Sequence, residues 1–375
     1  MSQATDPARI KGRRIALVLG TSTGGVGRHV RALAAGLVAR GAAVTVCAPA
    51  SVEESFGFGA LGATFVPTPI GKGWRFFDPR AVRRLRAAVG GAELVHAHGL
   101  RSSIAAAGVR ADSQPLVVTW HNAVLGSAAH RRVLARGEAA VARRSDLILG
   151  ASQDLADRAI ELGARNARLT MLPAPGLAPA TSSREAIRDR LGVDDGALVL
   201  TVARLVPQKR LHLLVDAIAM LNREHVNVTA VVVGGGRLHD ELANQAHRTG
   251  ARLHLLGERH DIADLLSAAD IFALSSAWEA RSFAVQEAML TGCPVVVPNV
   301  GGLPELVGDA GVVVAPDDAA ALATGIRTLV ADPARRSSLA AAARARAATW
   351  PDEASVIDET IADYLALLGR FSAEG

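Results

Sequence analysis

Cysteine, lysine and long apolar runs are all scarce in this sequence, and each shortage excludes a class of protein. The 375 residues include two cysteines, which excludes a disulfide scaffold and a cysteine-based zinc site. No apolar run approaches the roughly 18 residues that a membrane-spanning helix needs. The N-terminus, MSQATDPARIKGRR, is polar and lacks the apolar stretch of a signal peptide. We therefore expect a soluble, cytoplasmic chain.

Lysine is scarce because arginine takes its place. Lys11, Lys72 and Lys209 are the three lysines among 41 basic residues, which leaves 38 arginines. The net charge of +5 is spread over the chain, whereas nucleic-acid binding needs clustered cations. We therefore expect no nucleic-acid partner. The alanine- and arginine-rich tract 338–348 is interpreted as the solvated face of a helix.

Half of the residues are hydrophobic and 21% are charged, so the chain can build packed cores. Short apolar runs alternate with helical patterns, which is typical of parallel sheets joined by right-handed crossovers. The first helical pattern spans 30–38, and Gly41 ends it. The runs that predict buried strands are 15–19, 44–48, 64–66, 94–98, 116–120, 147–151, 169–172, 198–202, 228–233, 253–256, 271–274, 295–297 and 311–314.

Thirteen strands are too many for one ordinary doubly wound sheet, so the sequence predicts an α/β protein of two domains. The seam lies at 172–179, whose three prolines and one glycine suit neither helix nor strand. The predicted domains are 1–172 and 173–351, and a final amphipathic helix follows Trp350-Pro351 at 356–368. Ligands of such sheets bind beyond the carboxyl ends of the strands, so a cleft between the domains is the expected site.

Candidate residues in the first half follow strands. The first strand runs into GTSTGGVGRH (20–29) and a helix, where glycines and a helix N-terminus suit an anion such as phosphate. A tight turn is the alternative, because the spacing is not the GxGxxG fingerprint. His121 follows the fifth strand, as a hydrogen-bond donor to a ligand or as a structural histidine. His96 and His98 are expected to point to opposite faces and to bind no metal.

Charged residues follow strands in the second half. Arg204 leaves one strand and Lys209 begins the next helix, so the two cations can converge on one diphosphate. The triglycine 234–236 permits another close approach of backbone to ligand, although a packing turn is an equally good interpretation. Glu279 and Glu287 follow a later strand, and carboxylates accept hydrogen bonds from sugar or ribose hydroxyls. Together these residues indicate a nucleotide sugar.

With these residues, the segment 203–315 resembles the donor domain of the retaining GT-B glycosyltransferases of family 4, the glycosyl transferases group 1. The first half is similar more weakly, through GGVGRH (24–29), HAHG (96–99) and His121. The resemblance implies two doubly wound Rossmann-like domains facing across an interdomain cleft, with 352–375 crossing back to the first. The donor-domain motifs are Arg204…Lys209, Gly234-Gly235-Gly236, Leu256-Gly257, Ala269-Asp270-Ile271-Phe272, Glu279…Glu287-Ala288-Met289, Gly292-Cys293-Pro294-Val295-Val296 and Gly301-Gly302-Leu303-Pro304-Glu305.

The resemblance also implies roles for the matching residues. Arg204 and Lys209 would neutralise charge on the departing diphosphate, and His121 would contact the donor sugar. Glu279 would hold hydroxyls of the donor sugar, and Glu287 would hold the ribose of the nucleotide. The other expected donor-binding residues are Gly24, Gly25, Gly235, Arg281, Ser282 and Phe283. Members of the family use cations and helix dipoles in place of a divalent ion, so no metal or other cofactor is expected.

One motif departs from the family pattern. The family usually reads Glu-Gly-Phe-Gly where this sequence has Glu279-Ala280-Arg281-Ser282. Ser282 narrows the backbone freedom of the loop, and Arg281 is expected to add a cation beside the sugar pocket. The donor base and sugar therefore stay open between GDP- and UDP-sugars.

The implied reaction is transfer of a hexose, with retention, to a hydroxyl acceptor such as a cell-envelope lipid or glycan precursor. A nucleotide-sugar epimerase of the same architecture is an alternative, and it would need no acceptor. A non-catalytic nucleotide-sugar binder is disfavoured by the intact Arg/Lys and Glu/Glu sets. A pyridine-nucleotide oxidoreductase is disfavoured because no strand–GxGxxG–helix unit is followed by a ribose-binding acid.

A candidate membrane contact lies on the acceptor side. The segment GKGWRFFDP (71–79) precedes a helix that carries Arg80, Arg83, Arg84 and Arg86. Aromatic residues beside arginines at helical spacing suit an anionic membrane, so 74–86 is a candidate for peripheral contact with the inner face of the plasma membrane. The alternative is an ordinary amphipathic crossover helix whose preceding loop lines the acceptor site.

Overall fold

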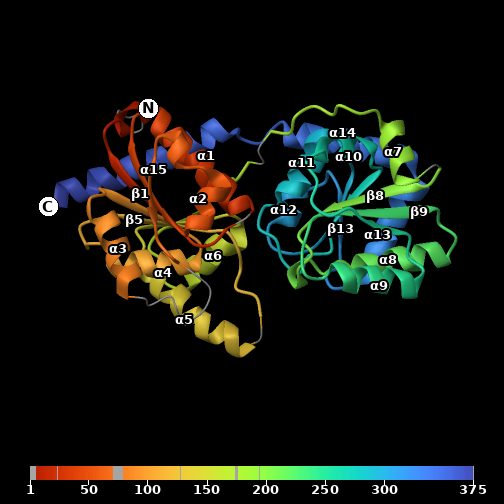
Figure 1. The fold of residues 1–375 in the computed structure, drawn as a ribbon, viewed down its shortest axis with the longest axis horizontal. Coiled ribbons are helices and arrows are strands. Elements are labelled where there is room, and N and C mark those ends of the chain that lie inside the picture. Colours follow the sequence, from red (N-terminus) through yellow and green to blue (C-terminus); the bar gives the residue numbers. More distant parts are fainter. Residues whose placement is uncertain are drawn as a thin grey trace. The chain divides into compact units, whose positions relative to one another are not determined.

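The computed structural model describes residues 6–22, 24–70, 79–126, 128–173, 176–193 and 195–374. The chain divides into two compact units, Met1–Leu172 with Pro351–Gly375, and Pro173–Trp350. Each unit is built around its own parallel sheet with helices on both faces (Figure 1). The predicted fold class, two Rossmann-like α/β domains, is confirmed.

The sheet of the first unit has the strand order β3-β2-β1-β4-β5-β6-β7. Ile15 of β1 pairs with Val44 on one side and with Leu94 on the other, so β1 is central. The strands are β1 (Arg14–Leu19), β2 (Ala43–Ala48), β3 (Thr64–Pro67), β4 (Leu94–His98), β5 (Leu116–Trp120), β6 (Leu147–Gly150) and β7 (Ala167–Leu169).

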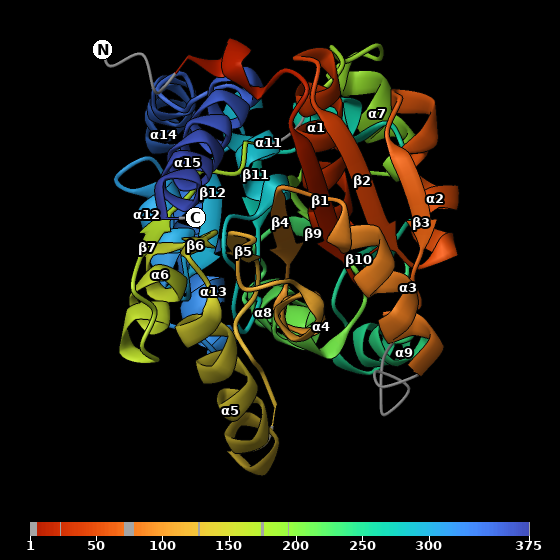
Figure 2. The ribbon, with the colours of Figure 1, turned by 90° about the vertical axis from the view of Figure 1, so that its left-hand side faces the viewer.

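Helices of the first unit cover both faces of this sheet. Side chains alternate along β1, so Ile15, Leu17 and Leu19 share one core with α1 and α15, whereas α3 and α4 contact β2 and β4 and lie side by side (Figure 2). The helices are η2 (Pro7–Ile10), α1 (Gly25–Ala39), α2 (Ala50–Phe56), η3 (Gly59–Leu61), α3 (Pro79–Gly90), α4 (Leu100–Val109), α5 (Ala128–Arg144), α6 (Gln153–Glu161) and α15 (Glu353–Glu374).

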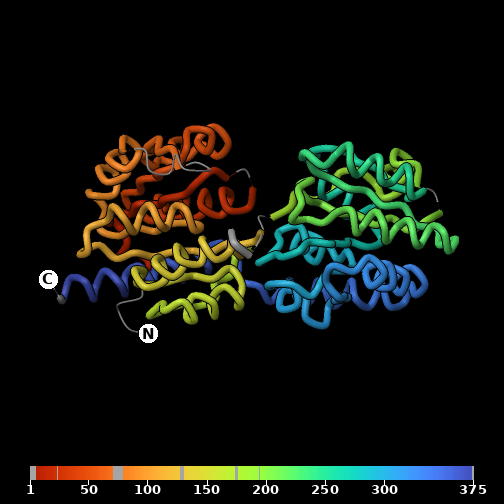
Figure 3. The backbone as a smooth tube through the Cα atoms, turned by 90° about the horizontal axis from the view of Figure 1, so that it is seen from below, coloured from red at the N-terminus to blue at the C-terminus, as the bar shows by residue number. Residues whose placement is uncertain are grey.

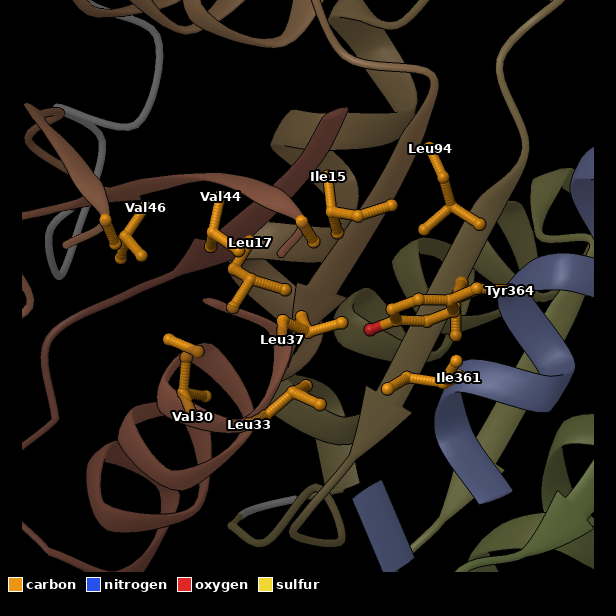
Figure 4. Packing of buried hydrophobic residues seen from close by; sticks show 14 of the residues in the cluster. Ile15, Leu17, Val30, Leu33, Leu37, Val44, Val46, Leu94, Ile361 and Tyr364 are labelled. Atoms are coloured by element: carbon orange, nitrogen blue, oxygen red, sulfur yellow. The ribbon is translucent and has the colours of Figure 1, made fainter. Parts of the chain in front are cut away.

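The C-terminal helix α15 is part of the first unit's core, and its return to that unit is visible in the backbone trace (Figure 3). Tyr364 is fully buried and lies with Ile361 among Leu17 and Leu37 (Figure 4). The Tyr364 hydroxyl is hydrogen-bonded to His96 Nδ1 at 2.5 Å. The helix therefore contributes both apolar area and a polar anchor to the centre of the sheet.

The second unit repeats this architecture with the strand order β10-β9-β8-β11-β12-β13. Its two faces form separate cores, one under α10, α11 and α14 and the other under α8 and α13. The strands are β8 (Ala197–Val202), β9 (Val228–Val233), β10 (Leu253–Leu255), β11 (Ile271–Ala273), β12 (Val295–Pro298) and β13 (Val312–Val314). The helices are α7 (Arg184–Leu191), η5 (Pro207–Lys209), α8 (Leu211–Arg223), α9 (His239–Thr249), α10 (Ile262–Ala268), α11 (Phe283–Thr291), α12 (Leu303–Val307), α13 (Ala319–Ala331) and α14 (Pro333–Ala347).

Three predicted elements differ from the structure. The strand expected at 169–172 is β7 at Ala167–Leu169. It contains Arg168, which forms ion pairs with Glu359 and Asp363 of α15, so β7 does not show as an apolar run in the sequence. The final helix, expected at 356–368, is longer at both ends. The tract 338–348 is helical but only partly solvated, because Arg346 donates to the carbonyls of Glu305 and Leu306. The aromatic segment 71–78 lies outside the described residues.

In the described part of the chain, no helix combines the length and the apolar character that crossing a bilayer requires.

Replacing Tyr364 with phenylalanine leaves the buried Nδ1 of His96 without its partner. A buried polar atom left unpaired costs about 1–3 kcal/mol, and we expect the free energy of unfolding in urea to fall by that amount. Tyr364→Ala should cost more, about 3–5 kcal/mol, because it also creates a cavity. If Tyr364→Phe unfolds at the wild-type urea concentration, the hydroxyl does not anchor α15.

Candidate functional site

Both sheets reverse their strand order at one place, between β1 and β4 in the first unit and between β8 and β11 in the second. In open parallel sheets, ligands bind beyond the carboxyl ends of the strands at this reversal. The loops after these four strands carry most of the candidate residues, and each unit is described by itself below.

Two loops of the second unit are joined where β8 and β11 end. The Ala277 N–H donates to the Gln208 carbonyl at 2.8 Å. Lys209 Nζ forms an ion pair with the Glu279 carboxylate, which also accepts a hydrogen bond from Ser276 Oγ at 2.6 Å. The side chains of Lys209 and Glu279 are 16% and 12% exposed. Two residues 70 positions apart in the sequence are thus brought into direct contact.

This ion pair combines the two kinds of group that a nucleotide sugar requires. An ammonium binds phosphate oxygens as a point charge, and a carboxylate accepts hydrogen bonds from sugar hydroxyls. The pairing neutralises both groups and holds them at the end of the sheet. Sequence reasoning missed Ser275 and Ser276, both buried, although two hydroxyls directly after a buried strand were a usable signal. Ser275 Oγ donates to the Lys209 carbonyl at 2.9 Å.

Arg204 and Glu287 lie on either side of this pair in the sequence. Arg204 directly follows the buried Ala203, is exposed, and has no carboxylate partner within the described residues. Its guanidinium is therefore accessible to an anion. Glu287 lies on α11 and is 7% exposed, so its carboxylate is largely removed from solvent.

The triglycine turn after β9 packs against the chain that leads to Arg204. A Cβ on Gly234 would lie 2.1 Å from the Ala203 carbonyl oxygen, and one on Gly236 would lie 2.5 Å from that of Leu205. Both glycines also have positive φ, 135° and 152°. The packing interpretation therefore accounts for these two glycines. Gly235, between them, accepts a hydrogen bond from the Leu205 N–H at 2.8 Å.

The loop that departs from the family pattern begins α11. Ser282 is its N-terminal capping residue, and Phe283 is its first residue. The guanidinium of Arg281 lies 5.2 Å from the ring centre of Trp350, at the end of the second unit. Burial lowers the pKa of Arg281 to about 10, although Glu305 opposes the shift, so the group is cationic at neutral pH. The position of Arg281 beside a sugar pocket stays a prediction. The structure adds a cation–π contact between Arg281 and Trp350, which the sequence did not indicate.

In the first unit, the glycine loop forms the start of α1. Gly24 is the N-terminal capping residue and Gly25 is the first helical residue. A Cβ on Gly24 would meet nothing within 4 Å, so the backbone is accessible there. Ser22 Oγ accepts a hydrogen bond from the Gly27 N–H at 2.9 Å. The positive end of a 15-residue helix suits an anion.

A cluster of imidazoles lies at the ends of β4 and β5. The ring centres of His29, His98 and His121 are 5.5 to 5.7 Å apart in each pair. His98 Nδ1 is 3.3 Å from His121 Nε2, and His96 lies 4.1 Å from His98 between ring centres. The expectation that His96 and His98 point to opposite faces was wrong, because residues two apart in a strand share a face. Sequence reasoning also did not single out His29.

The imidazoles are uncharged at neutral pH. Burial lowers the pKa of His29 to about 4 and holds the pKa values of His96, His98 and His121 well below 6.5. His98 Nε2 is buried and has no hydrogen-bond partner in the described part of the chain. Across the described residues, no group of three or more His, Cys, Asp or Glu is arranged to hold a metal ion. The cluster therefore presents neutral hydrogen-bonding groups.

Acidification should destabilise the first unit through this cluster. A histidine whose pKa falls from 6.5 to about 4 on folding takes up a proton in the unfolded state first, so stability is lost as the pH falls below 6.5. His29 is half-buried as a residue, although its ring lies against the rings of two other histidines. Its contribution to the free energy of unfolding that is lost at pH 5 is therefore at most about 2 kcal/mol.

Urea unfolding at pH 7 and pH 5 measures this effect. His29→Asn should reduce the loss of stability between the two pH values, whereas the same change at the exposed His239 should not. An equal pH dependence of stability in wild type and His29→Asn would show that burial does not lower the pKa of His29.

Comparisons with known proteins agree with this geometry. The family model of glycosyl transferases group 1 matches residues 183–346, and that of a glycosyl transferase 4-like domain matches residues 24–175. A chain with two such Rossmann-like domains has the GT-B class of enzyme fold. The chain belongs to the GT-B glycosyltransferases of group 1, family 4, and is a glycosyltransferase that uses nucleotide sugars.

The relatives include several kinds of transferase. Glycogen synthase of Mycobacterium tuberculosis is 32% identical over 92% of this chain and 91% of its own length. A GDP-mannose-dependent phosphatidylinositol monomannoside mannosyltransferase of Mycolicibacterium smegmatis is 33% identical over 48% of this chain and 51% of its own. The crystal structure of Anabaena Alr3699/HepE with UDP and glucose superimposes with a TM-score of 0.78 and 25% identity, covering 94% of this chain and 99% of that one.

Proposed function

We propose that this enzyme transfers a hexose from a GDP- or UDP-sugar to a hydroxyl acceptor, with retention at the anomeric carbon and without an essential metal ion. The observation that carries the proposal is the contact between Lys209, Glu279 and Ser276 at the ends of β8 and β11. The contact supports the proposal because it combines one cation, suited to a diphosphate, with one hydrogen-bonded carboxylate, suited to sugar hydroxyls.

In the proposed reaction, the bond between the anomeric carbon and the β-phosphate oxygen breaks, and the acceptor oxygen bonds to the same face of that carbon. The proton of the acceptor hydroxyl passes to the departing phosphate oxygen. Negative charge grows on the departing phosphate, and Arg204 and Lys209 stabilise it. The donor phosphate takes the place of Glu279 beside Lys209, which frees the carboxylate to accept hydrogen bonds from the sugar. Neutral His121 contacts the sugar without adding charge next to an oxocarbenium-like transition state.

Removing the ammonium of Lys209 should collapse turnover. Loss of one preorganised electrostatic group typically lowers kcat on the order of a hundredfold or more, and we expect this of Lys209→Ala. Lys11→Ala, which removes an exposed lysine of the first unit, is the matched control and should leave kcat unchanged. Wild-type kcat in Lys209→Ala, with its fold intact by circular dichroism, would exclude Lys209 from the mechanism.

The donor and the stereochemistry can be tested together. A panel of GDP-, UDP- and ADP-sugars should raise the unfolding temperature for the true donor, because ligand binding stabilises the folded state. Proton NMR of the product formed from that donor should show the anomeric configuration of the donor. An inverted product would contradict retention, and epimerised donor formed without any acceptor would favour the epimerase alternative.

The acceptor is proposed to be lipid-linked. The Mycolicibacterium smegmatis relative is named for a phosphatidylinositol acceptor. In this chain, α3 presents Arg83, Arg84 and Arg86 to solvent, and no carboxylate among the described residues pairs with them. We propose that this helix makes peripheral contact with an anionic membrane surface, where each arginine contributes on the order of 1 kcal/mol.

A further inference from the structure

An apolar cavity of about 190 Å³ lies between α3 and α4 in the first unit. From α3 it is lined by Ala81, Val82 and Leu85, and from α4 by Ile104 and Ala105. Thr68, Pro69 and Ile70, which follow β3, line another side.

Few polar groups face this cavity. Among the described lining residues, Thr68 is the one with a polar side chain, and its hydroxyl donates to the Val66 carbonyl at 3.1 Å. Water needs two or more polar partners to occupy an internal site, whereas a dry apolar cavity of about 150 Å³ takes up benzene. An apolar occupant therefore suits this cavity better than water.

Within the part of the chain that the structure describes, the cavity is open along one edge. Val82 and Ile104 are half-buried, and Gly108 is exposed. A Cβ on Gly108 would meet nothing within 4 Å, which shows open space directly beside the lining. A chain-like apolar molecule can therefore enter while its polar end stays in water.

Charge surrounds this opening. On the helical surface of α3, Arg84 and Arg86 flank the apolar stripe of Ala81, Val82 and Leu85 on its two sides. Neither α3 nor α4 contains an acidic residue. Both walls of the cavity therefore favour an occupant with a negative head group.

We propose that this cavity binds one acyl chain of an anionic membrane phospholipid, with its phosphate held by the exposed arginines of α3. The inference extends the proposed membrane contact and is independent of the donor chemistry. The arginines alone would bind any anionic surface. The cavity makes the contact specific for a lipid, because the burial of its methylene groups adds to the attraction of its head group.

Binding of palmitoyl-lysophosphatidylglycerol below its critical micelle concentration tests the site by isothermal titration calorimetry. We expect one lysolipid per full-length chain. Palmitoyl-lysophosphatidylcholine, which has the same acyl chain but no net charge, should bind about tenfold more weakly. The chainless head group glycerophosphoglycerol should not compete. Competition by that head group alone would overturn the proposal, because it would show a surface phosphate site without a chain pocket.

Two matched glycine variants locate the binding. Gly108→Phe adds a ring at a lining position where a Cβ meets nothing within 4 Å, and we expect at least about a tenfold loss of lysophosphatidylglycerol affinity, which corresponds to 1.4 kcal/mol. Gly90→Phe is the control, because Gly90 ends α3, is equally exposed, equally open and outside the lining. Ala105→Phe is a second filling variant in case Gly108→Phe does not fold. Wild-type affinity in a folded filling variant would overturn the proposal.

A charge variant separates the two parts of the site. In the triple variant Arg83→Gln, Arg84→Gln and Arg86→Gln, the affinities for the anionic and the neutral lysolipid should become equal. A preserved difference would contradict the role of these arginines. Thermal stabilisation by the donor is measured in the same variants and should be unchanged, so a failure of this site is distinguishable from a failure of the proposed transferase function.

Discussion

The strands of both sheets run parallel, and this constraint decides where the chemistry of the protein lies. Parallel strands place all their carboxyl ends at one edge of the sheet. The strand order runs outward in opposite directions from β1/β4 in one sheet and from β8/β11 in the other, although the strands of each pair are hydrogen-bonded neighbours. The loops there are not needed to continue the sheet, so their residues are free to meet a ligand. The glycine loop, the imidazole cluster and the Lys209–Glu279 pair all lie at these positions.

The two units differ in the charge of the side chains that follow their strands. In the second unit, full charges are held close together in the ion pair of Lys209 and Glu279. In the first unit, burial removes charge from four histidines and leaves neutral hydrogen-bonding groups. Full charges and neutral imidazoles therefore follow the strands of different units.

The C-terminal helix connects this chemistry to stability. Tyr364 of α15 fixes His96 through its hydroxyl, and His96 in turn lies against His98, which contacts His121. Residues from three distant parts of the chain thus form one continuous packed row from the core to the strand ends.

The sequence by itself determined the parallel α/β class, the positions of nearly all strands and the family motifs, because buried strands are recorded in apolar runs and ligand loops in their glycines and charges. It did not determine β7, whose Arg168 is neutralised by α15 from the far end of the chain. It also did not reveal the pairing of Lys209 with Glu279, the stacking of Arg281 on Trp350 or the association of four histidines. These depend on contacts between residues far apart in the chain, which local periodicity does not encode, and only the tertiary structure decided them.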